Sequence, residues 1–339
     1  MKARQSILFI SAILGSLSLA QAWAEGNYRA PRLANGQPDL QGVWTNVSLT
    51  RLIRGRQYQS NSISESEAQR IAQATSARAE RGLQATDPNE PAPRKGAGVG
   101  GYNSFYGDSG DSLAFINGEY RTTWLVEPTT GNLPYSPKGQ EIYQQAANFT
   151  RTNFDNPEAR PMAERCIVGF GSTGGPPMIN VLYNNNYQIV QSDDTVMILV
   201  EMNHDARIIR LDQKHNSDQL GKWLGDSVGH WEGDTLVVKT QHFNPGESLR
   251  LNFDQSFYMS KNAKVTERFT RISPSEIFYQ FAVDDPDIYS QVWRGEMIFN
   301  ASDERLYEYA CHEGNYALPG ILAGAREEER LQAEKNPGG

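Results

Sequence analysis

The chain has 339 residues, of which 38% are hydrophobic and 21% are charged, and its formal net charge is −8 from 40 acidic and 32 basic side chains. This composition excludes a disordered chain, a collagen and a multispan membrane protein, and the length suits one large domain or two ordinary ones. Basic residues never occur in a run longer than two, so no surface for phosphate neutralisation is visible. We expect no nucleic-acid partner.

The first 24 residues have the pattern of a secretory signal peptide. Basic residues precede an apolar stretch from Ile7 to Ala20, and small residues suited to a signal peptidase follow at Ala22 and Ala24. The apolar stretch is shorter than the roughly 20 residues that span a bilayer. We therefore expect a mature protein that is periplasmic or secreted and has no membrane span after the signal is removed.

Export would decide the oxidation state of the only two cysteines, Cys166 and Cys311. In an oxidising compartment, thiols tend to be paired, so we expect one disulfide between them. The alternatives are two buried free thiols or a metal site. A metal site is the weaker alternative, because neither cysteine has the close-spaced partner that is typical of structural zinc.

The sequence divides into a signal peptide (1–24), an N-terminal extension (25–110) and a main β-rich domain with a C-terminal helix (111–339). In the extension, the capping box that begins at Ser64 predicts a helix ending near Gly82. It is followed by a Pro/Gly-rich loop, residues 88–101, whose glycines lack the strand and helix context of a phosphate cradle.

The main domain contains two further predicted helices and many short strands. Ser136 and Pro137 favour a helix start that continues to about Asn148, and a charged surface helix is expected from Ile321 to about Ala333. Short apolar runs joined by polar turns predict about nine strands, without helical patterns between them. The runs on which this prediction rests are Tyr187–Gln191, Thr195–Glu201, Arg207–Leu211, His230–Trp231, Thr235–Thr240, Leu249–Phe253, Lys264–Arg271, Glu276–Val283, Gln291–Phe299 and Arg305–Cys311.

This spacing predicts a mainly β fold, with an antiparallel barrel or sandwich and a few peripheral helices. Alternation along Lys264–Arg271 places Glu267 on the same side as Val265 and Phe269, and Arg268 on the other side. Glu267 is therefore a candidate buried carboxylate. Burial raises a carboxyl pKa in the direction that suits a general acid, whereas a structural ion pair across the sheet is the alternative.

Other candidate proton carriers are an acid and three histidines. Glu201 and His204 are three residues apart at a predicted strand end, and His230 and His312 are each flanked by acids. An imidazole beside carboxylates suits proton transfer, although a histidine that only ties its own turn is the alternative for each. We expect His230 and His312 to line one pocket with Glu201 nearby.

The sequence gives little support for a metal ion or a serine nucleophile. It contains no HExxH pattern, so a divalent metal would need ligands from distant strands. Ser227 lies in a glycine-flanked segment that lacks the strand-to-helix elbow of serine hydrolases. We expect no cofactor.

Aromatic side chains are frequent in the predicted strands. Most of them belong to a core, but several lining a barrel lumen would also suit a small apolar or aromatic ligand. The candidate ligand-binding residues are Trp231, Tyr279, Trp293, Tyr309 and Arg268.

Four motifs carry a resemblance to a known family. The strings GDSVGHWEGDTLVVKT (225–240), VTERFTR (265–271), VDDPDIYSQVW (283–293) and EYACHEGN (308–315) resemble a widespread family of exported bacterial proteins. The resemblance implies export and assigns no reaction. Separately, Gly42-Val43-Trp44 resembles the G-x-W of lipocalin-like calycin barrels.

Three functional hypotheses follow from these observations. The first is a cofactor-independent acid/base enzyme, of isomerase, lyase or hydrolase type, that acts on a small apolar or aromatic molecule. The second is a non-catalytic periplasmic barrel that binds such a molecule, and the third is an envelope interaction module. Only the first hypothesis requires a general acid and a general base that both lie within hydrogen-bonding distance of one ligand.

Overall fold

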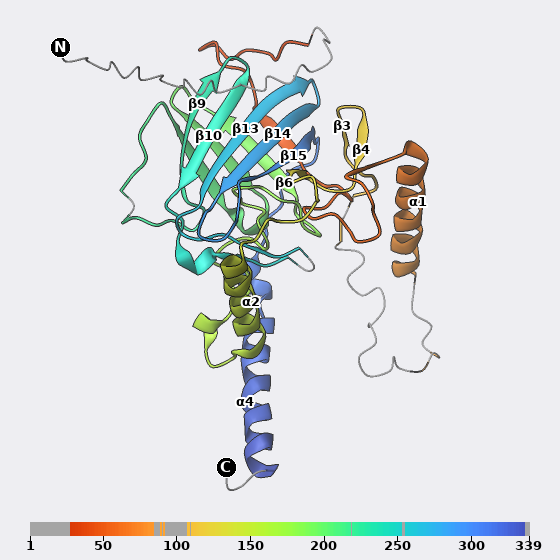
Figure 1. Ribbon diagram of the computed structural model, residues 1–339, viewed down its shortest axis with the longest axis vertical. Helices are drawn as coiled ribbons and strands as arrows, with labels where there is room; N and C mark the ends of the chain where they lie inside the picture. Colours follow the sequence, from red (N-terminus) through yellow and green to blue (C-terminus); the bar gives the residue numbers. More distant parts are fainter. Residues whose placement is uncertain are drawn as a thin grey trace, which may run out of the picture.

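A computed structural model describes residues 28–84, 89, 91, 107–108, 110–217, 219–252 and 255–335. Its centre is a closed β-barrel of nine strands, shown in Figure 1. The order around the barrel is β1 (Gly42–Thr45), β6 (Asn186–Gln191), β7 (Thr195–Val200), β8 (Ala206–Leu211), β9 (Asp226–Glu232), β10 (Thr235–Gln241), β13 (Lys264–Ser273), β14 (Glu276–Asp284) and β15 (Trp293–Ala301), which pairs with β1.

The barrel is mixed and not wholly antiparallel. A closed ring with an odd number of strands cannot alternate in direction throughout, so at least one neighbouring pair must be parallel. That pair is β8 and β9, in which Ile209 lies opposite Ser227. The expected antiparallel arrangement holds for the other eight pairs, and of the two predicted architectures the barrel is the correct one.

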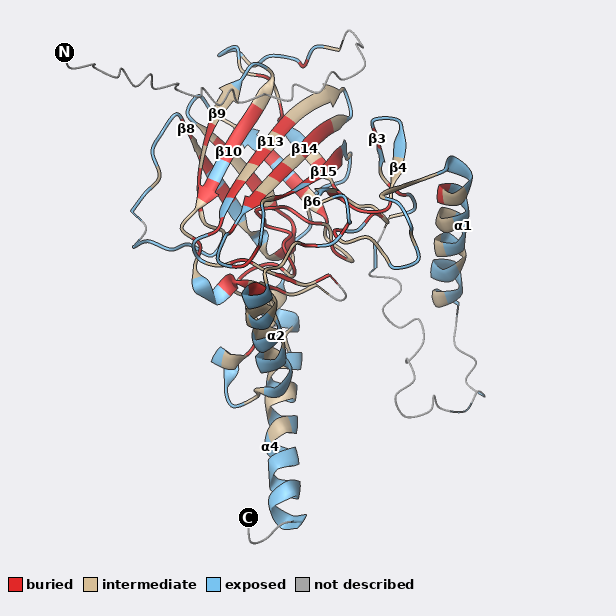
Figure 2. Ribbon diagram, in the orientation of Figure 1, coloured by how far each residue is buried: buried red, intermediate tan, exposed pale blue. Residues whose placement is uncertain are grey.

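Side chains alternate between the barrel interior and its outer face. On β13, Val265, Glu267 and Phe269 are buried, as the sequence pattern predicts, whereas the intervening residues are partly exposed. The interior is filled mainly by aromatic and branched side chains, so the core lies within the barrel. Figure 2 shows the buried residues concentrated on these strands.

Shorter elements surround the barrel. β5 (Leu125–Glu127) pairs with β15 beside the ring. A small sheet contains β2 (Ser62–Ile63), β3 (Phe115–Ile116) and β4 (Glu119–Arg121), and β11 (Leu249–Arg250) pairs with β12 (Phe257–Tyr258). Three short 3-10 helices are η1 (Pro157–Ala159), η2 (Met202–His204) and η3 (Pro245–Glu247).

Three longer helices lie outside the barrel. The predicted first helix is confirmed as α1 (Glu65–Gly82), in which the Ser64 hydroxyl accepts a hydrogen bond from the Glu67 amide. α2 (Pro137–Thr152) begins where predicted and is one turn longer, and α4 (Ala317–Lys335) begins four residues earlier than expected. Figure 1 shows α2 and α4 together at one end of the barrel, and Arg326 of α4 donates to the backbone just after α2.

The two ends of the barrel are closed differently. At one end, here called the hairpin end, the turns β6–β7, β9–β10 and β13–β14 meet residues 32–41, which hydrogen-bond to Asp234 and Asp193. At the other end, residues 166–181 form a glycine-rich and mostly buried segment, here called the plug loop. Its Met178 amide donates to the Tyr279 hydroxyl inside the barrel, which fixes the plug loop in the opening.

Some expectations need correction. Arg305–Cys311 is not a strand: it is irregular up to the short helix α3 (Cys311–Gly314), because its backbone follows the turn after β7 and joins no sheet. The predicted extension, 25–110, contributes β1 to the barrel.

The signal peptide, residues 1–24, and the loop at 88–101 apart from residues 89 and 91 lie outside the described residues. Within the described part, no helix has the length and apolar character needed to cross a membrane.

Candidate functional site

Glu267 belongs to a charged network inside the barrel. Its carboxylate accepts hydrogen bonds from Arg207 of β8, at 2.9 and 2.5 Å, and from the Tyr279 hydroxyl at 2.8 Å. Burial favours a neutral Arg207, but the adjacent Glu267 outweighs this and raises the guanidinium pKa. Burial and the charge of Glu267 also raise the pKa of Tyr279 well above its usual range. The expected burial of Glu267 is confirmed, and its contacts are those of a structural ion pair.

Glu201 and His204 lie together at the plugged end, where they hold the C-terminal segment. The buried Glu201 carboxylate accepts hydrogen bonds from the Asn186 side chain at 2.7 Å and from the Tyr307 amide at 3.0 Å. His204 Nε2 accepts from the Tyr309 amide at 3.3 Å. These contacts position the chain immediately before the disulfide.

The other two histidines are not brought together. His230 points from β9 to the outer face, where it hydrogen-bonds to Glu232, and Arg268 pairs with the same carboxylate. His312 is exposed on α3 beside Cys311, at the plugged end. β9 starts at the plugged end and runs towards the hairpin end, so His230 lies four residues, roughly 13 Å, further along the barrel wall. Neither of the two clefts described below is lined by His230 or by His312.

The predicted ligand-binding aromatics are likewise distributed over several places. Tyr279 and Trp293 are fully buried in the packed core, and Trp231 points inwards near the hairpin end. Tyr309 stacks on Tyr183 and lines a cleft of about 300 Å³ beside α4. They do not form one binding surface.

A different cleft, of about 330 Å³, lies where the plug loop meets the starts of β8 and β9. Its walls come from the plug loop, from β8, from the segment before β9 and from β9 itself. The lining residues are Ile167, Val168, Asp205, Ala206, Arg207, Ile208, Lys222, Trp223, Leu224, Gly225 and Ser227. This lining mixes apolar side chains with four polar or charged ones, and polar groups of this kind fix the orientation of a ligand in small-molecule sites.

Asp205 is the titratable group of this cleft with the clearest change in acidity. Burial raises the pKa of its carboxyl to about 6, although the Gly169 amide, Asn203, Arg250 and His204 act in the opposite direction. Its Oδ2 accepts a hydrogen bond of 2.6 Å from the Gly169 amide of the plug loop. Asp205 is only partly exposed, so its carboxyl is shielded and still lines the cleft. It can hold or release a proton near neutral pH.

A second acid with a raised pKa lies behind Asp205. Burial raises the pKa of Glu247, in η3, to about 7, opposed by Arg250 and reinforced by Asp205. Arg250 is itself buried, with its Nη1 3.8 Å from Glu247 Oε1. The plugged end thus holds one partly buried carboxyl, one buried carboxyl and one buried guanidinium, and titratable groups with shifted pKa values cluster at functional sites.

The remaining polar groups of the cleft have partners already. Lys222 Nζ donates to Asp226, which also accepts from Arg210 and Asn216. Burial opposes ionisation of Asp226, but these bonds together hold its pKa well below the usual range. Ser227 Oγ hydrogen-bonds to Thr240 at 2.8 Å. Asp205 is therefore the proton carrier that the cleft supports best.

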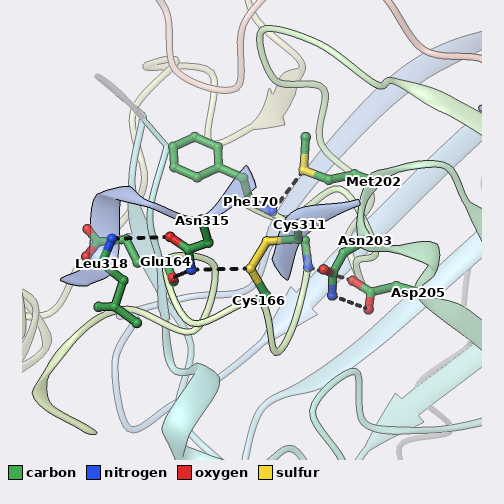
Figure 3. Close-up of a disulfide and its surroundings, with 10 residues drawn as sticks. Glu164, Cys166, Phe170, Met202, Asn203, Asp205, Cys311, Asn315 and Leu318 are labelled. Atoms are coloured by element: carbon green, nitrogen blue, oxygen red, sulfur yellow. Dashed lines mark hydrogen bonds between the residues drawn. A yellow bond between two sulfur atoms is a disulfide. The ribbon is translucent and has the colours of Figure 1, made fainter. Parts of the chain in front are cut away.

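The disulfide holds the plug loop against this site. Cys166, at the start of the plug loop, is bonded to Cys311, as the sequence predicts, and Asn315 donates to the backbone of Glu164 next to it. Figure 3 shows Asp205 and Asn203 close to the disulfide. Since Gly169 is three residues after Cys166, the crosslink restrains the amide that bonds to Asp205.

Sequence reasoning missed Asp205, Glu247 and Arg250. Asp205 was visible only as part of a polar turn, and no local pattern marks Glu247 or Arg250 as buried. The available signal was the glycine-rich string Gly169–Gly175, whose backbone can approach an acid closely. Among the described residues, no group of three or more His, Cys, Asp or Glu side chains is placed to hold a metal ion.

Comparisons of the chain with family models, with curated proteins and with solved structures found no match.

Proposed function

We propose that this protein is an exported acid/base enzyme that moves a proton on a small, largely apolar or aromatic molecule bound in the cleft beside Asp205. The observation that carries the proposal is the shielded Asp205 carboxyl, whose pKa is raised to about 6 while it lines a cleft of about 330 Å³. A group that titrates near the working pH is the most effective general acid or base.

The proposed step is proton transfer at a carbon next to a carbonyl. The Asp205 carboxylate takes the proton, and the electron pair of the C–H bond moves into the carbonyl to form an enolate. The Asp205 carboxylic acid then returns a proton to the same or another atom, which completes an isomerisation. The Gly169 amide holds one carboxylate oxygen in place throughout. Ile208, Trp223 and Leu224 give the body of the substrate an apolar surface to lie against.

The experiment that tests this proposal measures hydrogen exchange on candidate carbon acids. Phenylacetone and phenylpyruvate are incubated in D2O with the mature protein, and loss of the proton next to the carbonyl is followed by ¹H NMR. We expect exchange above the buffer rate with the wild type and a loss of at least about 100-fold with Asp205→Asn, which keeps the shape of the side chain. Asp303→Asn, on an exposed segment, is the matched control. Equal exchange by wild type and Asp205→Asn contradicts the proposal.

The apolar walls also favour a second candidate, a binding protein without catalysis. Ile208 and Trp223 are large apolar side chains that stay exposed at the cleft, as in sites that hold an apolar ligand. A binding protein would retain ligand affinity in Asp205→Asn and show no exchange in any form.

A further inference from the structure

The outer face of the barrel carries a row of apolar side chains across β6, β7 and β8. Among the described barrel strands, Val190 and Ile208 are the only large apolar residues that are exposed, at 38% and 50%. They are two strands apart and in the same register, because Met197 of β7 lies opposite Val190 on one side and opposite Ile208 on the other. Residues that are paired in this way project from the same face of a sheet. The three side chains therefore stand side by side on the outside of the barrel.

A second apolar pair lies next to this row. Leu199 of β7 is opposite Ala206 of β8, two residues along each strand from Met197 and Ile208, and both project from the outer face. Together the five residues are here called the apolar face: Val190, Met197, Leu199, Ala206 and Ile208. The one charged side chain that projects outwards from β6, β7 or β8 is Arg210, which pairs with Asp226 at 2.8 Å.

Other parts of the barrel wall have the polar outer residues that a solvated sheet face normally carries. Lys239 of β10, Arg268 of β13 and Gln280 of β14 lie on their strands at outward positions and are exposed or partly exposed. The apolar face therefore differs from the rest of the wall in chemistry, and an exposed apolar surface of this kind marks an interaction site.

The apolar face is continuous with the cleft beside Asp205. Ala206 and Ile208 belong to both, and Asp205 directly precedes Ala206. Trp223 and Leu224 come before β9, on one side of β8, whereas β7 and β6 lie on the other side. The apolar face thus extends the cleft away from Trp223, by two strand spacings or about 10 Å, as far as Val190.

The size and charge of the apolar face fit a chain of a small molecule. A stable protein interface uses roughly 20–30 residues on each side, far more than these five. Gln188, Thr195 and Arg210 border the apolar face with polar groups on β6, β7 and β8. A narrow, uncharged strip that begins at a ligand cleft suits an unbranched hydrocarbon chain.

We propose that the molecule bound in the cleft carries an unbranched alkyl chain, which lies on the apolar face across β8, β7 and β6. The inference rests on the function proposed above and narrows its substrate class to carbonyl compounds with an alkyl chain. The carbonyl end lies in the cleft with its reacting carbon near Asp205, and the chain passes Ile208 and Met197 towards Val190. A span of about 10 Å is roughly the length of an octyl chain.

Binding of methyl ketones of increasing length tests this inference. Dissociation constants for 2-butanone, 2-hexanone and 2-octanone are measured at pH 7 by NMR titration of the mature protein. We expect about twofold tighter binding for each added CH2 group, roughly half the effect of complete burial, because one side of the chain stays in water. From 2-butanone to 2-octanone the gain should therefore be at least about tenfold.

Two variants locate this gain on the apolar face. Met197→Thr and Val190→Thr keep β-branched or strand-compatible side chains at exposed or partly exposed positions, and each should reduce the gain for 2-octanone by at least about threefold while leaving 2-butanone unchanged. Leu331→Gln, on α4, is the matched control, since this leucine is 40% exposed and Val190 is 38% exposed. It should retain the full gain. Circular dichroism confirms that each variant is folded.

A measurement on the wild type covers the case in which the variants do not fold. 2-Octanone should shift the methyl resonances of Ile208, Met197 and Val190, whereas 2-butanone should shift that of Ile208 and leave Val190 unchanged. Equal affinity for all three ketones, a gain that persists in folded Met197→Thr and Val190→Thr, or unshifted Met197 and Val190 methyls with 2-octanone overturns the inference. Dimerisation of the wild type that Met197→Thr abolishes assigns the apolar face to a second copy of the chain and also overturns it.

The same ketones separate this inference from the proposed enzyme. Binding that strengthens with chain length on the apolar face, without Asp205-dependent proton exchange on any ketone, refutes the enzyme alone. Exchange on 2-butanone that depends on Asp205, with no gain in affinity for 2-octanone, refutes the inference alone.

Discussion

The raised pKa of Glu247 leads to a quantitative prediction of how the free energy of unfolding changes with pH. Burial raises the pKa of this carboxyl from 4.5 to about 7 in the folded protein, whereas the unfolded chain restores the ordinary value. Between these two values the folded state holds a proton that the unfolded state releases. The free energy of unfolding therefore falls as the pH rises through this range.

The size of the effect follows from the two pKa values. Linkage gives a loss of about 2.5 kcal/mol between pH 5 and pH 8 from this group, and the loss is complete slightly above pH 7. In Glu247→Gln the titrating group is gone, so the variant should gain about this amount relative to the wild type over the same range. Any constant cost of the amide cancels, because only the change with pH is compared.

The assay is urea unfolding, followed by tryptophan fluorescence, at pH 5, 6, 7 and 8. The matched control is Glu158→Gln, an exposed acid in η1, whose profile should stay within about 0.5 kcal/mol of the wild type. Parallel profiles for wild type and Glu247→Gln would refute the raised pKa.

Three further predictions concern other parts of the chain. Glu267→Gln leaves Arg207 buried without its counter-ion and should lower the free energy of unfolding by about 3 to 5 kcal/mol, whereas replacing both by apolar residues should recover most of this loss in the same urea assay. The mature protein should expose no alkylatable thiol before reduction, by intact mass. Replacing Cys166 and Cys311 by Ser should cost about 5 kcal/mol, given their sequence separation of 145 residues, and an unchanged urea midpoint would show that the crosslink does not stabilise the fold. His230→Gln should change stability by less than about 0.5 kcal/mol and leave proton exchange unaltered, because this histidine is on the outer face. A loss of exchange would restore His230 to the site.

The position of the plug loop has a consequence for the role of the disulfide. The plug loop supplies both the Gly169 amide that bonds to Asp205 and the Gly175 carbonyl that contacts Arg250. One crosslink at Cys166 therefore restrains the loop that bonds to Asp205, the proton carrier of the proposed site. This gives the disulfide a place in the proposed mechanism in addition to its contribution to stability.

Local patterns in the sequence were sufficient for much of the fold. The period-two alternation that placed Glu267 inwards and Arg268 outwards depends only on strand geometry, so it holds whichever strands are neighbours. The start of α1 at Glu65 and of α2 at Pro137 follows from capping residues within a few positions. The pairing of Cys166 with Cys311 was predicted from the count of cysteines and from the expectation of an oxidising compartment.

Only the tertiary structure decided the closure of the barrel, its parallel pair and the site. Whether β8 meets β9 in parallel depends on the path of the loop between them, which no local pattern records. Asp205, Glu247 and Arg250 become unusual because the plug loop and η3 remove them from water at the same place, and burial of this kind is a property of the packed chain. The histidines suggested acid/base chemistry by residue type alone, yet the register of β9 carries His230 away from the plugged end.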